Sequence, residues 1–231
     1  MENFGKITLH LGDCIDVLRE LPDFSYDLAI VDPPYFSGPE RREFYGKAIS
    51  TTGIKRRNYP KSEKWSLPDK LYFKELERVC KYYIVWGCNY FNYFFAPGRI
   101  VWDKCNQSTT FSDCEIAATN LFNSVRLFPF MWNGMCQGKS MYEGRVMQGN
   151  KKLNEKRIHP TQKPVALYGW LLNQYAKDGW KILDTHLGSG SIAIACDELG
   201  YALTGIEIDP VYYTMARERL TEHQKQLKLE L

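Results

Sequence analysis

Four consecutive residues could hold an amino group together with the flat ring that carries it. Asp32, Pro33, Pro34 and Tyr35 directly follow residues 26–31, an apolar run typical of a short buried strand. The Asp32 carboxylate can accept an N–H bond, and the prolines fix φ, so that the Pro33 carbonyl is held rigidly beside it. Tyr35 offers a face on which a nucleobase can stack. Two such acceptors draw an amine nitrogen toward tetrahedral geometry while it loses a proton; the structural alternative is a rigid turn.

A glycine-containing segment, residues 184–191, lies between a predicted strand and a predicted helix. Glycines in such a turn let the backbone approach a ligand closely. Glu207 ends the next predicted strand, where a carboxylate can accept hydrogen bonds from ribose hydroxyls. The segment lacks the Gly-x-Gly-x-x-Gly pattern of a pyrophosphate site, although a dinucleotide remains the alternative. The pattern therefore favours a nucleoside without a pyrophosphate, and S-adenosylmethionine is one.

A third polar segment, residues 159–164, precedes a predicted helix. Free N–H groups at a helix N-terminus suit a carboxylate, such as the methionyl end of that nucleoside. The segment is equally typical of an ordinary helix start.

The elements that must position these residues alternate along the chain. Apolar patterns predict strands at 7–11, 26–31, 82–86, 99–102, 116–119, 125–131, 181–184 and 201–206. They predict helices after Asp13, from about residue 66, and over 164–175, 191–199 and 210 onward, the last with Asp209 as N-cap. This alternation indicates an α/β open sheet with helices on both faces, in a single domain over 1–231.

Two segments concentrate positive charge on an otherwise acidic body. Residues 36–65 carry a net charge of +5 and residues 137–158 carry +4, whereas the whole chain carries +3. Such a distribution suits a polyanion-binding surface, or simply two solvated loops. We treat 36–65 and 132–158 as loop insertions in the domain.

The rest of the composition excludes several classes of protein. No apolar run approaches the ~18 residues of a membrane helix, and the N-terminus lacks the pattern of a signal peptide. The seven cysteines are odd in number and form no Cys-x-x-Cys pair, so neither a disulfide framework nor a metal site is expected. These features indicate an intracellular, cytoplasmic protein without a membrane partner.

In their order, these motifs resemble the beta class of DNA amino-methyltransferases, over nearly the whole chain. In that class the Asp/Ser-Pro-Pro-Tyr motif comes early and the cofactor motifs come last, which is a circularly permuted order. The resemblance implies a Rossmann-like methyltransferase sheet, S-adenosylmethionine as cofactor and DNA as substrate. It implies site-specific methylation of adenine N6, because aspartate in the first position usually marks adenine enzymes and serine marks cytosine-N4 enzymes.

The resemblance also implies roles for individual residues. The catalytic residues would be Asp32, Pro33, Pro34 and Tyr35. The cofactor-binding residues would be Asp13, Cys14, Thr161, Gln162, Lys163, Asp184, Leu187, Gly188, Gly190, Ser191 and Glu207. Of these, Asp13 would lie at the cofactor adenine unless it only caps a helix, Glu207 at the ribose, and residues 161–163 at the carboxylate. DNA would be bound by Arg41, Arg42, Lys55, Arg56, Arg57, Lys151 and Lys152.

Two departures from the family pattern leave alternatives open. Thr185 and His186 stand where many members have Pro and Phe, and His186 can simply fill the place of the aromatic ring. No large recognition domain fits in the chain, so base reading falls on the two insertions or on a second subunit of a homodimer. A cytosine-N4 enzyme, an RNA or protein-glutamine methyltransferase, an inactive cofactor-binding regulator and a restriction endonuclease partner all stay open.

Overall fold

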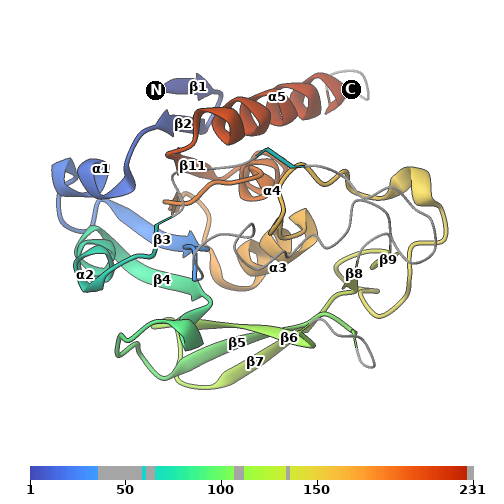
Figure 1. Ribbon diagram of the computed structural model, residues 1–231, viewed down its shortest axis with the longest axis horizontal. Coiled ribbons are helices and arrows are strands. Elements are labelled where there is room, and N and C mark those ends of the chain that lie inside the picture. The colour runs from blue at the N-terminus through green and yellow to red at the C-terminus, as the bar shows by residue number, and fades with distance from the viewer. Residues whose placement is uncertain (36–58, 61–65, 107–111, 134–135, 228–231) are drawn as a thin grey trace.

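The computed structural model describes residues 1–35, 59–60, 66–106, 112–133 and 136–227 (Figure 1). Within these ranges the main sheet has nine strands in the order β1-β2-β11-β10-β3-β4-β6-β5-β7. Its strands are β1 (Glu2–Phe4), β2 (Ile7–Leu11), β3 (Tyr26–Val31), β4 (Cys80–Trp86), β5 (Gly98–Asp103), β6 (Cys114–Thr119), β7 (Val125–Pro129), β10 (Lys181–Asp184) and β11 (Ala202–Glu207). A separate hairpin pairs β8 (Trp132–Asn133) with β9 (Cys136–Gln137).

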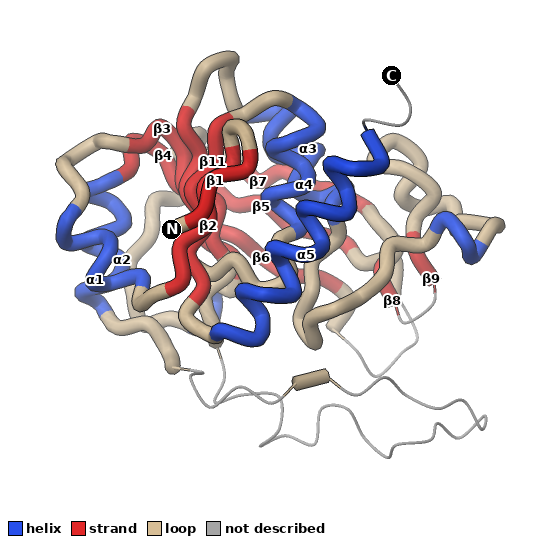
Figure 2. The backbone as a smooth tube through the Cα atoms, turned by 90° about the horizontal axis from the view of Figure 1, so that it is seen from above, coloured by secondary structure: helices blue, strands red, loops and turns tan. Residues whose placement is uncertain are grey.

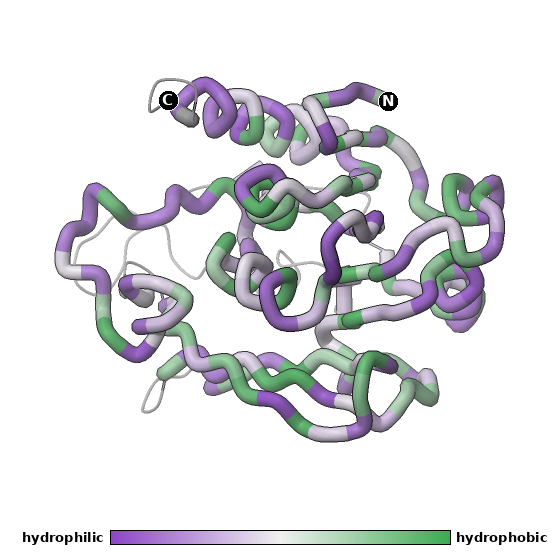
Figure 3. The backbone as a smooth tube through the Cα atoms, turned by 180° about the vertical axis from the view of Figure 1, so that it is seen from behind, coloured by the Kyte–Doolittle hydropathy of each residue, from purple (hydrophilic) through white to green (hydrophobic). Residues whose placement is uncertain are grey.

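Helices cover both faces of the sheet, as predicted (Figure 2). On one face lie α1 (Cys14–Glu20) and α2 (Lys70–Val79), which bury Leu18 and Leu76 against the strands. On the other lie α3 (Val165–Tyr175), α4 (Ser191–Leu199) and α5 (Pro210–Leu227), which bury Leu167, Ile192 and Leu220. Helix α5 is hydrophilic over much of its length in Figure 3, in keeping with a helix that buries only one stripe of side chains.

Local capping explains where several of these elements begin. The Asp69 carboxylate accepts the N–H groups of Leu71 and Tyr72, so α2 begins at Lys70 rather than near residue 66, where we predicted it. Asp209 accepts the N–H of Val211 at 2.8 Å, which confirms its predicted role at the start of α5. The edge strand β1 and the β8–β9 hairpin carry no pattern strong enough to have been predicted.

The order of the strands brings together motifs that are distant in sequence. Strands β2, β11, β10, β3 and β4 are mutually parallel, and β10 pairs directly with β3 through Ile182–Leu28 and Leu183–Ala29. The last strand-helix-strand unit of the chain thus lies between the first strands and β3. The carboxyl ends of these strands share one edge, which is where open α/β sheets bind ligands. No helix among the described residues is long and apolar enough to span a bilayer.

Candidate functional site

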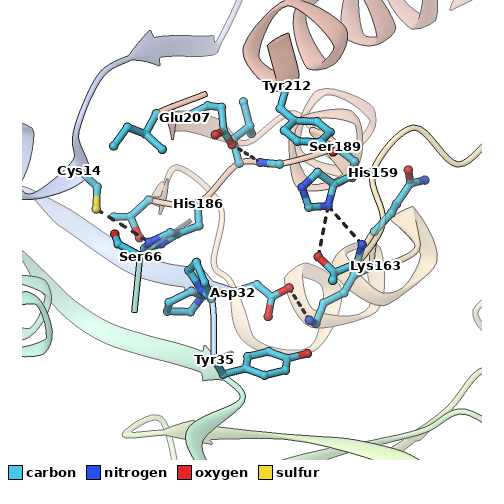
Figure 4. A pocket seen from close by; sticks show the side chains of 18 of the residues that line it. Cys14, Asp32, Tyr35, Ser66, His159, Lys163, His186, Ser189, Glu207 and Tyr212 are labelled. Atoms are coloured by element: carbon cyan, nitrogen blue, oxygen red, sulfur yellow. Dashed lines mark hydrogen bonds and ion pairs between the residues drawn. The ribbon is translucent and has the colours of Figure 1, made fainter. Parts of the chain in front are cut away.

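A cavity opens at the carboxyl ends of β2, β11, β10 and β3, where the three predicted segments meet Asp13 and Cys14 (Figure 4). Its walls hold the predicted residues Asp13, Cys14, Asp32, Pro33, Pro34, Tyr35, Thr161, Gln162, Lys163, Leu187, Gly188 and Glu207. They also hold Gly12, Ser66, His159, Tyr168, Thr185, His186, Ser189, Ile208 and Tyr212. The arrangement joins the proposed amine site at the end of β3 to the proposed nucleoside site at the ends of β10 and β11.

Asp32 lies at the end of β3 with its two carboxylate oxygens in different environments. Oδ2 contacts the Lys163 ammonium at 2.5 Å, whereas Oδ1 is buried with no hydrogen-bond partner among the described residues. Burial raises the pKa of Asp32, while the nearby Lys163 opposes the increase. A buried acceptor without a donor is costly in an isolated protein, so Oδ1 is well suited to receive an N–H from a ligand.

Tyr35 is held by close packing on one side of the cavity. Its ring stacks on Tyr90 with a centroid distance of 4.6 Å and an interplanar angle of 7°. Gly87 lies directly against the same ring, because a Cβ there would be 2.5 Å from Tyr35 Cδ1, and its φ of +69° also favours glycine. The ring is therefore fixed in place before any ligand binds.

Glu207 is tied to the backbone of the glycine segment. Its Oε2 accepts the N–H of Gly188 at 2.7 Å, and Oε1 accepts the N–H of Asp209 at 2.9 Å. Burial raises the pKa of Glu207 above its ordinary value. Each oxygen keeps a further lone pair, so the carboxylate can accept ribose hydroxyls in the orientation that these two N–H groups impose.

The predicted helix-capping role of Asp13 is confirmed, because its carboxylate accepts the Ile15 N–H at 2.9 Å. The residue also lines the cavity, so capping and ligand contact are compatible at this position. The neighbouring Cys14 has its Sγ 4.0 Å from Nε2 of His186, and burial raises the Cys14 pKa to about 12. The thiol is thus protonated at neutral pH and poorly suited to act as a nucleophile.

The His186 ring packs against another aromatic ring, as expected of a residue that fills the place of an aromatic side chain. Its ring meets Tyr72 edge-on at 5.3 Å, and Nδ1 lies 2.9 Å from Oγ1 of Thr185, which itself lies 2.6 Å from the Tyr72 hydroxyl. Burial lowers the pKa of His186 to about 3, so the ring is neutral. His186 therefore forms part of a packed, hydrogen-bonded wall.

Three predicted cofactor residues lie behind the cavity wall rather than in it. Asp184 is buried beneath the glycine segment, accepts the N–H of His186 at 3.0 Å, and has its pKa raised to about 8 by burial. Gly190 caps α4 with a φ of +70° and backs onto Ala216 of α5. Ser191 bonds to the Ser189 hydroxyl. These residues shape the segment that faces the cavity.

The segment that carries His159 to Lys163 is fastened to the helices by one carboxylate, Glu155. Its Oε1 contacts Arg219 of α5 at 2.6 Å and the Gln162 amide at 2.7 Å, and its Oε2 caps α3 by accepting the Val165 N–H at 2.9 Å. Sequence patterns gave no sign of this role, because Arg219 lies far along the chain. Gln162 is thereby occupied within the protein, although it borders the cavity.

Inside that segment His159 lies on the cavity wall, edge-on to Tyr212 at 4.3 Å. Its Nδ1 accepts from the Thr161 N–H at 3.3 Å, and burial lowers its pKa to about 3. Tyr212, Tyr168 and Ser66 also reach the cavity, although no sequence pattern had singled them out.

The predicted DNA-binding residues fall into two groups. Arg41, Arg42, Lys55, Arg56 and Arg57 lie outside the described residues. Lys151 and Lys152 form an exposed 3-10 turn in the second basic segment and do not line the cavity. Their roles stay predictions.

Comparisons with known proteins find similarity to DNA methylases. Residues 137–218 match the model of a family described as N6/N4 DNA methylases. The chain is 26% identical to the type II methyltransferase M.HinfI of Haemophilus influenzae, over 93% of this chain and 68% of that protein. The resemblance to the DNA amino-methyltransferases is confirmed.

Solved structures of DNA methylases share the fold of this chain. A putative DNA modification methylase from Thermus thermophilus, in complex with S-adenosylmethionine, matches with a TM-score of 0.54 and 16% identity, over 94% of this chain and 93% of that one. The cytosine-N4-specific PvuII DNA methyltransferase matches with a TM-score of 0.52 and 15% identity, over 97% and 96% of the two chains. The predicted Rossmann-like methyltransferase sheet is therefore confirmed.

Proposed function

We propose that this chain is an S-adenosylmethionine-dependent DNA methyltransferase that acts on an exocyclic amino group, adenine N6. The observation that carries the proposal is the buried Oδ1 of Asp32, which lacks a hydrogen-bond partner among the described residues and stands at a cavity shared with Glu207 and the glycine segment. The family match and the relatives described as DNA methyltransferases support the reaction class.

The residues of the cavity fit the proposed cofactor. S-adenosylmethionine supplies a methyl group on a sulfonium, and its ribose and amino-acid parts need acceptors and N–H donors. Glu207 offers fixed carboxylate oxygens, and Gly188, with a φ of +53°, leaves its own position on the wall without a side chain. The Thr161 to Lys163 segment lies across the cavity from them and remains our proposal for the carboxylate end, with the Lys163 ammonium itself paired with Asp32.

The target base would enter the cavity out of the DNA stack, because its amine is otherwise held in the base pair. Tyr35, fixed by Tyr90 and Gly87, would stack on the flipped base. Asp32 Oδ1 and the Pro33 carbonyl would accept the two N–H bonds of the amine. No covalent enzyme intermediate is needed, and the protonated Cys14 thiol fits a direct transfer.

Adenine rather than cytosine is proposed from the aspartate in the first motif position. The fold does not discriminate between the bases, because the PvuII enzyme, described as cytosine-N4-specific, has a similar structure. Site-specific recognition by residues 36–65 and 132–158, a single domain over 1–231 and a homodimer are further parts of the proposal.

Nucleoside mass spectrometry tests this function. Purified protein and the Asp32→Ala variant are incubated with varied DNA and methyl-labelled S-adenosylmethionine, and the hydrolysed nucleosides are analysed. We expect labelled N6-methyladenine from the wild type and none from the variant, whose cofactor affinity should be largely unchanged. Labelled N4-methylcytosine would keep the mechanism and change the base. Tight cofactor binding without label on DNA would reject DNA methylation in favour of RNA methylation or an inactive regulator.

A further inference from the structure

Four charged side chains form a chain of ion pairs that begins at the cavity. Lys163 contacts Asp32 Oδ2 at 2.5 Å and Glu115 Oε2 at 2.9 Å, and Lys104 forms an ion pair with the other oxygen of Glu115. Asp32 follows β3, Glu115 lies in β6, Lys104 follows β5, and Lys163 precedes α3. The two carboxylates and two ammonium groups balance in charge, which a cluster removed from water requires.

Lys163 is the most enclosed member of the cluster. Only 2% of its side chain is exposed, and its ammonium lies 5.5 Å from the centroid of the buried Trp86 ring. Water cannot compensate such a charge, so its two carboxylate partners must do so. A lysine whose ammonium is shared between two carboxylates within the protein is poorly placed to serve primarily as the ligand of a cofactor carboxylate.

We propose that Lys163 and Glu115 are positioning residues for the methyl transfer. Lys163 holds Oδ2 of Asp32 and thereby leaves Oδ1 for the target amine. Glu115 keeps Lys163 paired when Asp32 takes up a proton. This inference rests on the proposed function and deepens it, because it assigns Lys163 to the reacting carboxylate.

The proton balance of the reaction explains the second carboxylate. The target nitrogen forms a bond to the methyl carbon as the carbon–sulfur bond breaks and its electron pair passes to sulfur. The nitrogen then carries an extra proton, which it gives to Asp32 Oδ1 and which later leaves to solvent. A neutral Asp32 would leave a buried Lys163 without a counter-ion if Glu115 were absent. With Glu115 in place, the ammonium stays paired throughout.

Several groups on neighbouring elements act on the Asp32 carboxyl. They are Lys163, Glu115, Lys104, Tyr35 and Tyr168, together with Asp184 at the end of β10. The two lysines favour the ionised form of Asp32, whereas burial and Glu115 oppose it. Removing Lys163 or Glu115 must therefore move the titration of Asp32 in opposite directions.

The pH dependence of kcat tests the proposal. On its acidic side kcat falls as Asp32 becomes protonated, so the pKa of this acid limb can be compared among variants. The variants are Lys163→Met, Glu115→Gln and the double variant, with Lys81→Met as control, because Lys81 pairs with Asp27 at 3.1 Å away from the cavity. The pKa of the acid limb should be lowest for Glu115→Gln, then rise through the wild type and the double variant to Lys163→Met. The double variant lies above the wild type because Lys163 acts on Asp32 more strongly than Glu115 does.

The magnitude of the effect follows from the role of Asp32 as proton acceptor. Lys163→Met should lower kcat at neutral pH about 100-fold, the lower end of what a positioned acid or base contributes. The dissociation constant of S-adenosylmethionine, measured by calorimetry, should change less than about threefold, because we place the ammonium at Asp32. Lys81→Met should match the wild type in both respects.

Two results would overturn the inference. In the first, Lys163→Met loses cofactor affinity but retains kcat, which would assign the ammonium to the cofactor carboxylate. In the second, every folded variant has the same acid-limb pKa as the wild type, which would show that Lys163 and Glu115 do not act on Asp32. A wild type that methylates no DNA rejects the proposed function instead. In that case the carboxyl 13C resonance of Asp32, titrated by NMR in the same variants, must still show the stated order of pKa values, or the inference fails as well. If Lys163→Met does not fold, the wild type and Glu115→Gln give the decisive comparison.

Discussion

Glu155 positions the segment from His159 to Lys163 at the wall of the cavity, and removing its carboxylate tests this role. Glu155→Ala would delete a contact of 2.6 Å to Arg219, a bond of 2.7 Å from Gln162 and the cap of 2.9 Å on Val165. The Glu155 and Arg219 side chains are only 20% and 14% exposed, so solvent replaces little of what is lost.

The expected cost follows from these contacts. A hydrogen bond to a charged group contributes about 1.5–3 kcal/mol and a helix cap about 1 kcal/mol. Arg219 keeps the carbonyl of Ser189 at 2.9 Å and the hydroxyl of Ser191 at 3.0 Å, which softens the loss. We expect the free energy of unfolding to fall by about 3 kcal/mol, which lowers Tm by about 6–12 °C in a chain of this length.

Calorimetric unfolding and cofactor titration together give the assay. Because Glu155 fastens the segment that ends in Lys163, Glu155→Ala should also weaken S-adenosylmethionine binding, by about tenfold. Glu155→Gln keeps one acceptor oxygen and should lose roughly half as much stability. A double-mutant cycle with Arg219→Met should give a coupling energy above about 1 kcal/mol. A Tm within about 2–3 °C of the wild type and an unchanged cofactor affinity would refute the reasoning, which assigns the segment's position to this carboxylate.

Three further predictions concern other parts of the site. Gly87→Ala places a Cβ 2.5 Å from Tyr35, so it should lower kcat/KM for DNA at least about tenfold in the methylation assay with little effect on cofactor affinity; unchanged kcat/KM would show that the ring needs no such support. Asp184 has a pKa of about 8 in the folded protein and an ordinary value of 3.8. Its contribution to the free energy of unfolding is therefore full below pH 3.8. Between pH 3.8 and 8 this contribution falls by about 1.4 kcal/mol per pH unit. Asp184→Asn should remove that slope in urea titrations between about pH 5 and 7.5, and parallel curves for the two proteins would contradict the shift. Neutralising Lys55, Arg56 and Arg57 should weaken DNA binding and flatten its dependence on salt in fluorescence anisotropy, whereas an unchanged salt slope would exclude these residues as the DNA contact.

The sequence predicted the parts of the site that depend on local patterns. Asp32 follows one recognisable apolar strand and Glu207 ends another, and parallel strands bring their carboxyl ends to one edge. Their presence in one cavity follows from these two facts, and the structure confirms it. The helix caps at Asp13 and Asp209 were predictable for the same reason, because each cap contacts residues only a few positions away.

The contacts made across the fold were not predictable. The partners of Lys163 come from β3 and β6, and the partner of Glu155 comes from α5. Nothing in the residues around either position indicates these partners, because they are set by how the sheet and helices pack. The local pattern associated Lys163 with a ligand carboxylate, whereas the structure pairs its ammonium with two carboxylates of the protein itself.

The pairing of β3 with β10 has a consequence for how the protein is made. Synthesis proceeds from the N-terminus, so the strand that carries Asp32 leaves the ribosome long before Lys181 to Asp184, its neighbour in the sheet. Until then one side of β3 has unpaired backbone groups, the kind of edge that invites aggregation. The nascent chain thus holds the proposed catalytic motif before the proposed site for the methyl donor exists, and the two come together only when the last third of the chain inserts into the middle of the sheet.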